Sequence, residues 1–219
     1  MGLLVLLPVT PSLAYTSEDF VTELKTKFRT TSSIFLKARS TGLDLSAESS
    51  RMDFGDTATI VLAYSYPNQY LQVVDGQSNK RQYLMIKNDS MAISYPHLDY
   101  SEKRTISKRQ RRSLLVRNVP IAGAIMGLTS GEVPHDSIDV TTGDTELTVV
   151  VHKYREDLPF KRVEARFRRD NLQPVYFILE GKRKFRIDIV HYEEEKRFPE
   201  WIEDALLKFD FKQLEDGPL

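Results

Sequence analysis

The stretch that decides the fold is FKRVEARFRRDNLQPVYFILEGKRKFRIDIVHYEEEKRF, from Phe160 to Phe198. Its first part alternates apolar and charged residues, and alternate residues of a strand point to opposite faces of a sheet. One side carries Val163, Ala165 and Phe167, and the other carries Arg162, Glu164, Arg166 and Arg168. Two short turns then lead into two more runs of the same kind. The stretch therefore predicts three antiparallel strands with one solvent-facing side and one covered side.

Similar runs precede this stretch. They show strand-like alternation and are bounded by turn residues such as Asp75 with Gly76, Asn88 with Asp89, and Gly143 with Asp144. We expect strands at residues 33–40, 57–67, 69–74, 81–87, 90–96 and 145–154. A sheet this wide rarely stays flat. The sequence thus predicts a mainly β fold with some α-helix, built on one large, curled antiparallel sheet.

Two segments have the pattern of helices that could cover the apolar side of this sheet. In residues 17–29, Phe20, Val21, Leu24 and Phe28 recur on one helical face, and Thr16 or Ser17 can cap the start. A second, short helix is expected in PEWIEDALLKF, residues 199–209. We expect both helices to lie on the apolar side.

A third possible cover is the uncharged run VPIAGAIMGLTSG, Val119–Gly131. It is too short to cross a bilayer, which takes about 20 apolar residues. If Pro120 starts a helix, the apolar face consists of Ile121, Ile125 and Leu128, with Met126 beside them. Two glycines weaken such a helix by about 1 kcal/mol each. We interpret it as a movable lid, although an ordinary core helix fits these residues equally well.

Composition limits what the chain can do. Its 219 residues favour one domain, and its 31 Lys plus Arg equal its 31 Asp plus Glu, so no overall positive charge favours nucleic acid. The absence of Cys excludes disulfides and thiolate sites. The start, MGLLVLLPVTPSLAY, has the layout of a signal peptide cut after Ala14, although no Lys or Arg precedes its apolar run and a buried strand is the alternative. We expect residues 1–14 to be this peptide and residues 15–219 to form one exported domain.

Motifs for catalysis are missing from the sequence. It has no phosphate-binding loop, no GxGxxG and no GxSxG, and its four histidines have no metal-binding spacing. We expect His152 and His191 to be hydrogen-bonded or solvent-facing. The sequence therefore predicts neither an enzyme nor a metal or cofactor site.

A basic stretch with seven cations and no acid runs from Lys103 to Arg117. These charges could contact lipid phosphates or an acidic partner. They could also belong to a solvated loop or to an edge strand whose charges prevent edge-to-edge pairing, and we slightly favour this interpretation. The sequence leaves both interpretations open.

The order of these segments resembles a known family. An amphipathic N-terminal helix is followed by SIFLKARSTGLDLS, by IVLAYSYPNQYLQVV and by IKNDSMAISYP, and the chain closes with the three strands quoted first. Over residues 19–211 this arrangement resembles the LolA-type periplasmic carriers of outer-membrane lipoproteins. The resemblance implies an unclosed β-barrel with lid helices around an apolar cavity for acyl chains.

The resemblance also implies a function and a site. The function is that of a monomeric periplasmic chaperone, which accepts lipoproteins from an inner-membrane releasing transporter and passes them to an outer-membrane acceptor. The alternative is an exported lipid-binding or lipid-sensing module of the same architecture that acts on free lipids, and a hydrolase with an unrecognised site ranks third. The implied cavity and lid residues are Leu62, Tyr64, Tyr66, Val163, Phe167 and Phe177, together with Ile121, Ile125, Met126 and Leu128.

One position departs from the family. The carriers typically have an Arg before the Pro of the turn that matches Pro67, and this Arg holds the lid closed. Here the position is Tyr66, whose single hydroxyl offers fewer hydrogen bonds than a guanidinium. We therefore expect a more easily opened lid.

Overall fold

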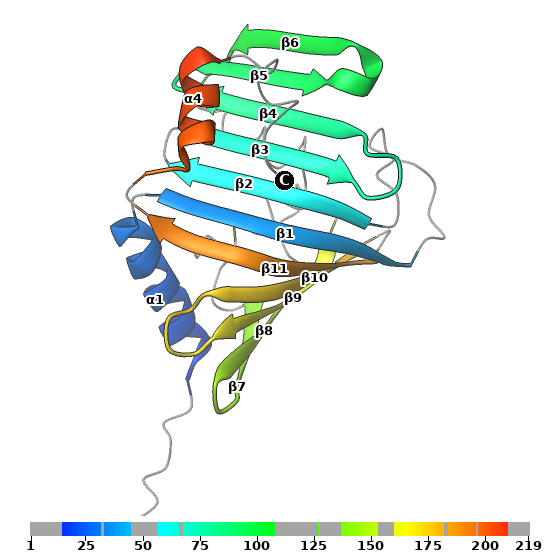
Figure 1. The fold of residues 1–219 in the computed structure, drawn as a ribbon. Coiled ribbons are helices and arrows are strands. Elements are labelled where there is room, and N and C mark those ends of the chain that lie inside the picture. The colour runs from blue at the N-terminus through cyan, green and yellow to red at the C-terminus, as the bar shows by residue number, and fades with distance from the viewer. Residues whose placement is uncertain are drawn as a thin grey trace, which may run out of the picture.

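The computed structural model describes residues 15–31, 33–44, 57–65, 68–107, 127, 137–152, 160–181, 184–195 and 197–209. Within these residues, eleven strands form one antiparallel sheet in the order β6-β5-β4-β3-β2-β1-β11-β10-β9-β8-β7 (Figure 1). The edge strands of this described sheet, β6 and β7, do not pair with each other, so the sheet is not closed. The predicted fold class, a mainly β fold on one large antiparallel sheet, is confirmed.

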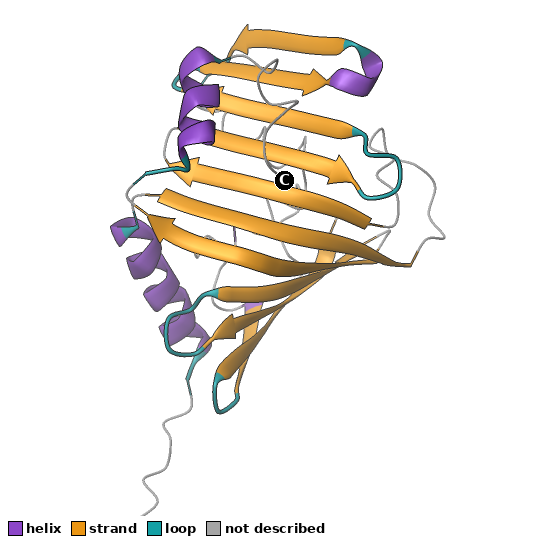
Figure 2. Ribbon diagram, viewed as in Figure 1, coloured by secondary structure: helices purple, strands orange, loops and turns teal. Residues whose placement is uncertain are grey.

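The elements have the following bounds: α1 Ser17–Thr30, β1 Ser33–Asp44, β2 Thr57–Ser65, β3 Asn68–Asp75, β4 Arg81–Lys87, β5 Ser90–Tyr95, the short 3-10 helix η1 Pro96–Leu98, β6 Tyr100–Thr105, β7 Ile138–Thr142, β8 Glu146–His152, β9 Phe160–Arg168, β10 Pro174–Gly181, β11 Lys184–Glu195 and α4 Glu200–Lys208. Figure 2 shows the helices beside the broad sheet.

The two faces of the sheet differ because alternate side chains point in opposite directions. We call the face that carries Val163, Phe167 and Leu62 the inner face, and the opposite one the outer face. In β9 the predicted alternation is confirmed, since Val163, Ala165 and Phe167 are buried whereas Arg162, Glu164 and Arg166 are less so. On this half of the sheet the outer face is the solvent-facing one.

The other half of the sheet is buried on both faces. In β3 every residue from Gln69 to Asp75 is buried, and in β4 every residue from Gln82 to Ile86 is. Inward-facing Leu71 and Leu84 belong to one apolar cluster, while outward-facing Tyr70 and Tyr83 belong to another. The expectation of one solvent-facing side along the whole sheet is therefore wrong for this half.

Helix α1 confirms the prediction for residues 17–29. Thr16 caps it, with its Oγ1 accepting a hydrogen bond from the Asp19 backbone N–H at 3.1 Å, and the Asp19 carboxylate accepts one from the Thr16 backbone N–H at 3.0 Å. This reciprocal pair is a capping box. Phe20, Val21 and Leu24 on its apolar face are buried in the inner-face cluster. The helix therefore covers the inner face, as expected.

Helix α4 also forms where the sequence predicts it, but on the other side of the sheet. Its Ile202, Ala205 and Leu206 pack in the outer cluster, which contains Phe35 and Tyr70 of the sheet. In Figure 1 it lies across the strands of the β2–β5 half, away from α1. The expectation that α4 covers the same face as α1 is wrong, because β1–β5 present a second apolar face that also requires a cover.

Strands β6 and β7, the two edges of the described sheet, were not among the expected strands. Strand β6 carries Lys103 and Arg104 of the basic stretch, and most of its residues are exposed. This supports the edge-strand interpretation for these two cations. Residues 108–117 of the basic stretch lie outside the described residues.

One turn requires a glycine. Gly76 follows β3, and its N–H donates to the backbone C=O of Thr57 at 2.8 Å. A Cβ on Gly76 would lie 2.1 Å from Oγ1 of Thr57, which is too close for any side chain. The turn predicted at Asp75 and Gly76 therefore joins β3 tightly to the start of β2.

Candidate functional site

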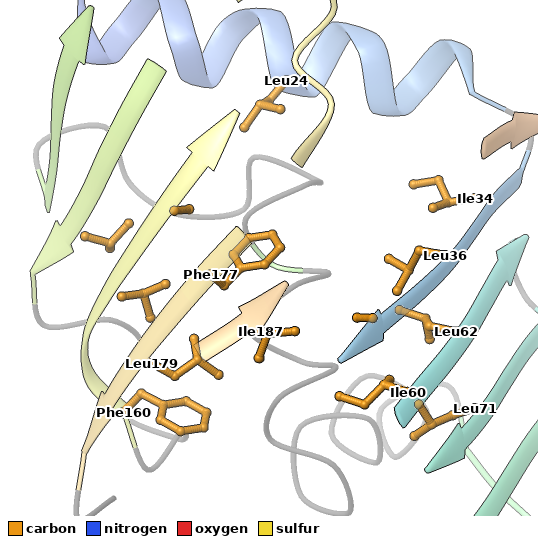
Figure 3. Close-up of a cluster of buried hydrophobic side chains, with 14 of the residues drawn as sticks. Leu24, Ile34, Leu36, Ile60, Leu62, Leu71, Phe160, Phe177, Leu179 and Ile187 are labelled. Carbon is orange, nitrogen blue, oxygen red and sulfur yellow. The ribbon is translucent and has the colours of Figure 1, made fainter. Parts of the chain in front are cut away.

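The strongest candidate site is the apolar layer on the inner face. Every strand of the described sheet except β6 contributes a buried side chain to this layer, and α1 contributes three. Figure 3 shows side chains of β9, β10 and β11, among them Phe160 and Phe177, pointing toward side chains of β1, β2 and β3, among them Leu36 and Leu62. The curled sheet thus gathers one continuous apolar surface on its inside.

The structure places five of the ten predicted site residues. Leu62, Val163, Phe167 and Phe177 are each 0% exposed and belong to the inner-face cluster. Tyr64 is half-buried and packs against the same cluster. Strands β2, β9 and β10 therefore bring all five to one face. Tyr66 and the predicted lid residues Ile121, Ile125, Met126 and Leu128 lie outside the described residues.

Helix α1 is fastened to the sheet near both of its ends. Near the N-terminus, Ser17 Oγ donates to the C=O of Ile138 in β7 at 2.6 Å, and the Phe20 ring meets the Phe167 ring edge-on at 5.2 Å. Near the C-terminus, the Phe28 ring stacks on Tyr64 at 5.7 Å. The helix therefore spans from an edge strand to the strands at the middle of the sheet.

A small pocket lies beneath the last turn of α1. It is lined by Leu24, Lys27, Phe28, Thr31, Ile34, Leu172 and Tyr192. The Lys27 ammonium pairs with Glu194 Oε1 at 2.6 Å and lies 5.7 Å from the centre of the Tyr192 ring. Burial, followed by the charge of Glu194, raises the pKa of Tyr192 above its ordinary value. This phenol is therefore neutral at physiological pH.

Two polar residues on the inner face were missed by sequence reasoning. Gln69 in β3 and Gln82 in β4 alternate in register with Leu71 and Leu84, which belong to the inner-face cluster. Gln69 is 5% exposed and Gln82 is 0% exposed. The signal was present in the sequence, because Gln69 alternates in step with Leu71 and Val73, and Gln82 alternates in step with Leu84 and Ile86.

The outer face of β8–β11 carries paired charges instead. Arg162 bonds Glu164 at 3.0 Å and Glu180 at 3.1 Å, and Arg166 bonds Glu146 at 3.1 Å. The guanidinium carbons of Arg166 and Arg186 lie 5.0 and 4.4 Å from the centre of the Tyr176 ring. Since cations and acids alternate here, this surface presents no single sign of charge to a partner.

The histidines in the strands follow the sequence interpretation. Nε2 of His152 lies 2.8 Å from Asp139 Oδ2, and Nε2 of His191 lies 2.6 Å from Glu193 Oε1. Among the described residues, no three His, Asp or Glu side chains gather in a way that could hold a metal ion. Neither α1 nor α4, the helices of the described part, has the length and apolar composition needed to span a bilayer.

Searches of the sequence against protein-family models and against curated proteins find no match. Solved structures are similar in fold at low identity. A LolA superfamily protein from Nitrosomonas europaea has a TM-score of 0.41 at 9% identity, over 87% of this chain and 97% of that chain. The lipoprotein LppX of Mycobacterium tuberculosis has a TM-score of 0.45 at 9% identity, over 83% and 99%. An uncharacterized conserved protein from Thermus thermophilus has a TM-score of 0.49 at 6% identity, over 84% and 94%.

Proposed function

We propose that the protein is a lipid-binding carrier that shelters acyl chains on the inner face of its sheet. The observation that carries this proposal is the continuous apolar layer, to which ten strands and α1 contribute on one side of a curled, unclosed sheet. The two edge strands of the described sheet, β6 and β7, do not pair with each other, so a long chain can enter between them. The order of segments that resembles LolA-type carriers supports the same function.

The energetics of acyl chains explain why such a carrier is useful. Exposing a chain of about 16 carbons to water costs on the order of 12 kcal/mol, at about 0.8 kcal/mol per methylene. A lipid or lipoprotein therefore does not cross an aqueous compartment unaided. An apolar inner face can bind the acyl chain and so keep it out of water.

We propose in addition that the cargo is a lipoprotein and that the protein works in the periplasm. The protein would receive its cargo from an inner-membrane lipoprotein-releasing transporter and give it to an outer-membrane acceptor. It would carry out this transfer as a monomer and without catalysis. The alternative, an exported module that binds or senses free lipids, uses the same inner face and differs only in its cargo.

Native mass spectrometry of gently purified protein tests the general proposal. We expect adducts with the masses of acylated molecules, and their absence together with no uptake of N-phenyl-1-naphthylamine, an apolar fluorescent probe, would overturn it. A release assay with inner-membrane vesicles separates the two cargoes. Release of lipoproteins into solution supports the lipoprotein carrier, and extraction of phospholipid alone supports the alternative.

A pair of matched variants tests whether the inner face is the binding surface. Tyr64→Asp places a charge at the half-buried end of the inner-face cluster, and Val190→Asp places the same charge on a side chain that is 68% exposed. Because an unpaired charge is poorly tolerated beside an acyl chain, we expect Tyr64→Asp to weaken probe binding at least about tenfold. Val190→Asp should leave it unchanged. Circular dichroism confirms that both variants are folded.

A further inference from the structure

Three glutamines are buried in β3 and β4, and they differ in the face they point to and in their hydrogen bonds. Gln72 points to the outer face, where its Oε1 accepts a hydrogen bond from the Tyr70 hydroxyl at 3.2 Å. Gln69 and Gln82 point to the inner face, and within the described part of the chain their Oε1 atoms have no hydrogen-bond partner. The unsatisfied amides thus lie on the face that we propose for acyl chains.

Of these two inward-facing glutamines, Gln82 is the more deeply buried. It is 0% exposed, and its Nε2 donates to the hydroxyl of Tyr95 at 3.2 Å. Tyr95 is itself half-buried against the inner-face cluster, and burial raises its pKa above the ordinary value. The phenol is therefore neutral, and it stands beside the amide as a second hydrogen-bonding group.

A buried amide with an open hydrogen-bonding position is unfavourable unless a partner fills it. Turning the amide over exchanges its oxygen with its nitrogen, but one polar atom of Gln82 stays unpaired in either orientation. A leucine of similar size would avoid this cost altogether. The sheet nevertheless carries glutamine at this inward position, between apolar neighbours such as Leu84 and Val73.

We propose that Gln82, with Tyr95 beside it, forms a polar subsite that hydrogen-bonds the hydroxyl or amide group of an amphipathic lipid whose chain lies on the inner face. This inference rests on the proposed function and narrows its ligand class. Hydroxyl and amide groups both donate and accept hydrogen bonds, so they satisfy Gln82 in either orientation of its amide. A pure hydrocarbon chain does not satisfy it.

Preference between two matched lipids tests the subsite. Hexadecanol and heptadecane have the same number of heavy atoms, but only the alcohol can donate or accept a hydrogen bond. Each is titrated against the protein carrying N-phenyl-1-naphthylamine, and the ratio of their dissociation constants is measured. We expect the wild type to prefer the alcohol by about tenfold, because a site built for a hydrogen-bonding group rejects the analogue that lacks it.

The Gln82→Leu variant should lose this preference while binding heptadecane at least as tightly as the wild type does. Gln72→Leu is the matched control, since it changes a buried glutamine on the outer face, and it should keep the preference. If Gln82→Leu does not fold, Tyr95→Phe removes the neighbouring hydroxyl and should reduce the preference.

The possible failures are distinguishable. A wild type that takes up neither the probe nor either lipid overturns the proposed function itself. A wild type that binds both lipids, with a preference that is unchanged in Gln82→Leu or equally reduced in Gln72→Leu, overturns the subsite and leaves the proposed function standing.

Discussion

The ammonium of Lys27 in α1 lies 2.6 Å from Oε1 of Glu194 in β11 and also donates to the backbone C=O of Asn171, between β9 and β10. Only 21% of the Lys27 side chain and 26% of the Glu194 side chain are exposed. One side chain thus ties the last turn of α1 to two separate parts of the sheet. Lys27 also lines the small pocket beneath the last turn of α1.

Lys27→Met should loosen this end of the helix. The variant keeps the apolar stem and removes the charge, so we expect faster hydrogen exchange of the backbone amides in the last turn of α1. The N-terminal end should exchange as before, because Ser17 still bonds Ile138. The loss of stability should be about 1 kcal/mol, as expected for a single partly exposed ion pair.

Lys25→Met is the control for this prediction, since Lys25 is exposed on the same helix. It should change neither hydrogen exchange nor stability. Equal effects of the two variants would mean that the contacts of Lys27 do not hold the helix.

The layer around Phe167 should dominate stability. This ring is 0% exposed and meets Phe20 of α1 at 5.2 Å and Phe177 of β10 at 6.1 Å. We expect Phe167→Ala to lower the free energy of unfolding by about 3 to 5 kcal/mol, measured by urea denaturation. Arg168→Ala, at the next and exposed position, should change it by less than about 0.5 kcal/mol. A small effect of Phe167→Ala would contradict its place at the centre of the inner face.

Much of this layer could be predicted from the sequence. The alternation of Val163, Ala165 and Phe167 with charged residues identifies their shared face without any tertiary information. Likewise, α1 carries a local cap and a periodic apolar face, which are features of the chain itself.

The rest of the fold and of the candidate site depends on tertiary contacts, which local sequence patterns do not predict. Strand β2 contains the run Ile60 to Ala63, in which every residue is apolar, so both of its faces are buried and alternation cannot tell them apart. For the same reason, the apolar stripe of α4 does not indicate which of two apolar sheet faces it will cover. The open hydrogen-bonding position of Gln82 is visible only when all its neighbours are known.

Gly76→Ala should destabilise the turn between β3 and β4. The added Cβ would lie 2.1 Å from Thr57 Oγ1 and 3.1 Å from Thr57 O, so the start of β2 must shift. We expect a loss of about 1 to 3 kcal/mol by urea denaturation, the usual range for overpacking. Adding Thr57→Ala removes the closest atom and should restore part of the loss. If the double variant is no more stable than Gly76→Ala, the clash with the hydroxyl is not the cause.

Stability should fall in acid partly through Glu180. Its hydrogen bond from Lys184, and then the charge of Arg162, hold the pKa of this carboxyl below its ordinary value of 4.5. A lowered pKa in the folded state means that the ionised form stabilises the fold above the ordinary pKa, and that this contribution disappears as the pH falls through the folded pKa. Glu180→Gln should therefore lower the urea midpoint at about pH 7 and have little effect at about pH 2.5.

Lys184→Met removes the first partner of Glu180 and should show the same dependence on pH. At neutral pH it should lower the free energy of unfolding by about 0.5 kcal/mol or less, because the pair is partly exposed. A deficit of the same size at both pH values, for either variant, would exclude ionisation of Glu180 as its cause.

Two neighbouring leucines of α4 should separate stability from binding. Leu206 is 5% exposed and packs in the outer cluster, whereas Leu207 is 70% exposed. We expect Leu206→Ala to cost about 2 to 3 kcal/mol in urea denaturation and Leu207→Ala less than about 0.5 kcal/mol.

Because α4 lies on the face opposite to the proposed acyl site, the folded Leu206→Ala protein should bind N-phenyl-1-naphthylamine with the dissociation constant of the wild type. Substitutions that share no contacts act independently, so the combination of Leu206→Ala with Tyr64→Asp should show the stability loss of the first added to that of the second, and the binding loss of the second alone. Weaker probe binding in Leu206→Ala itself would place part of the site beneath α4, and the assignment of binding to the inner face would then be wrong.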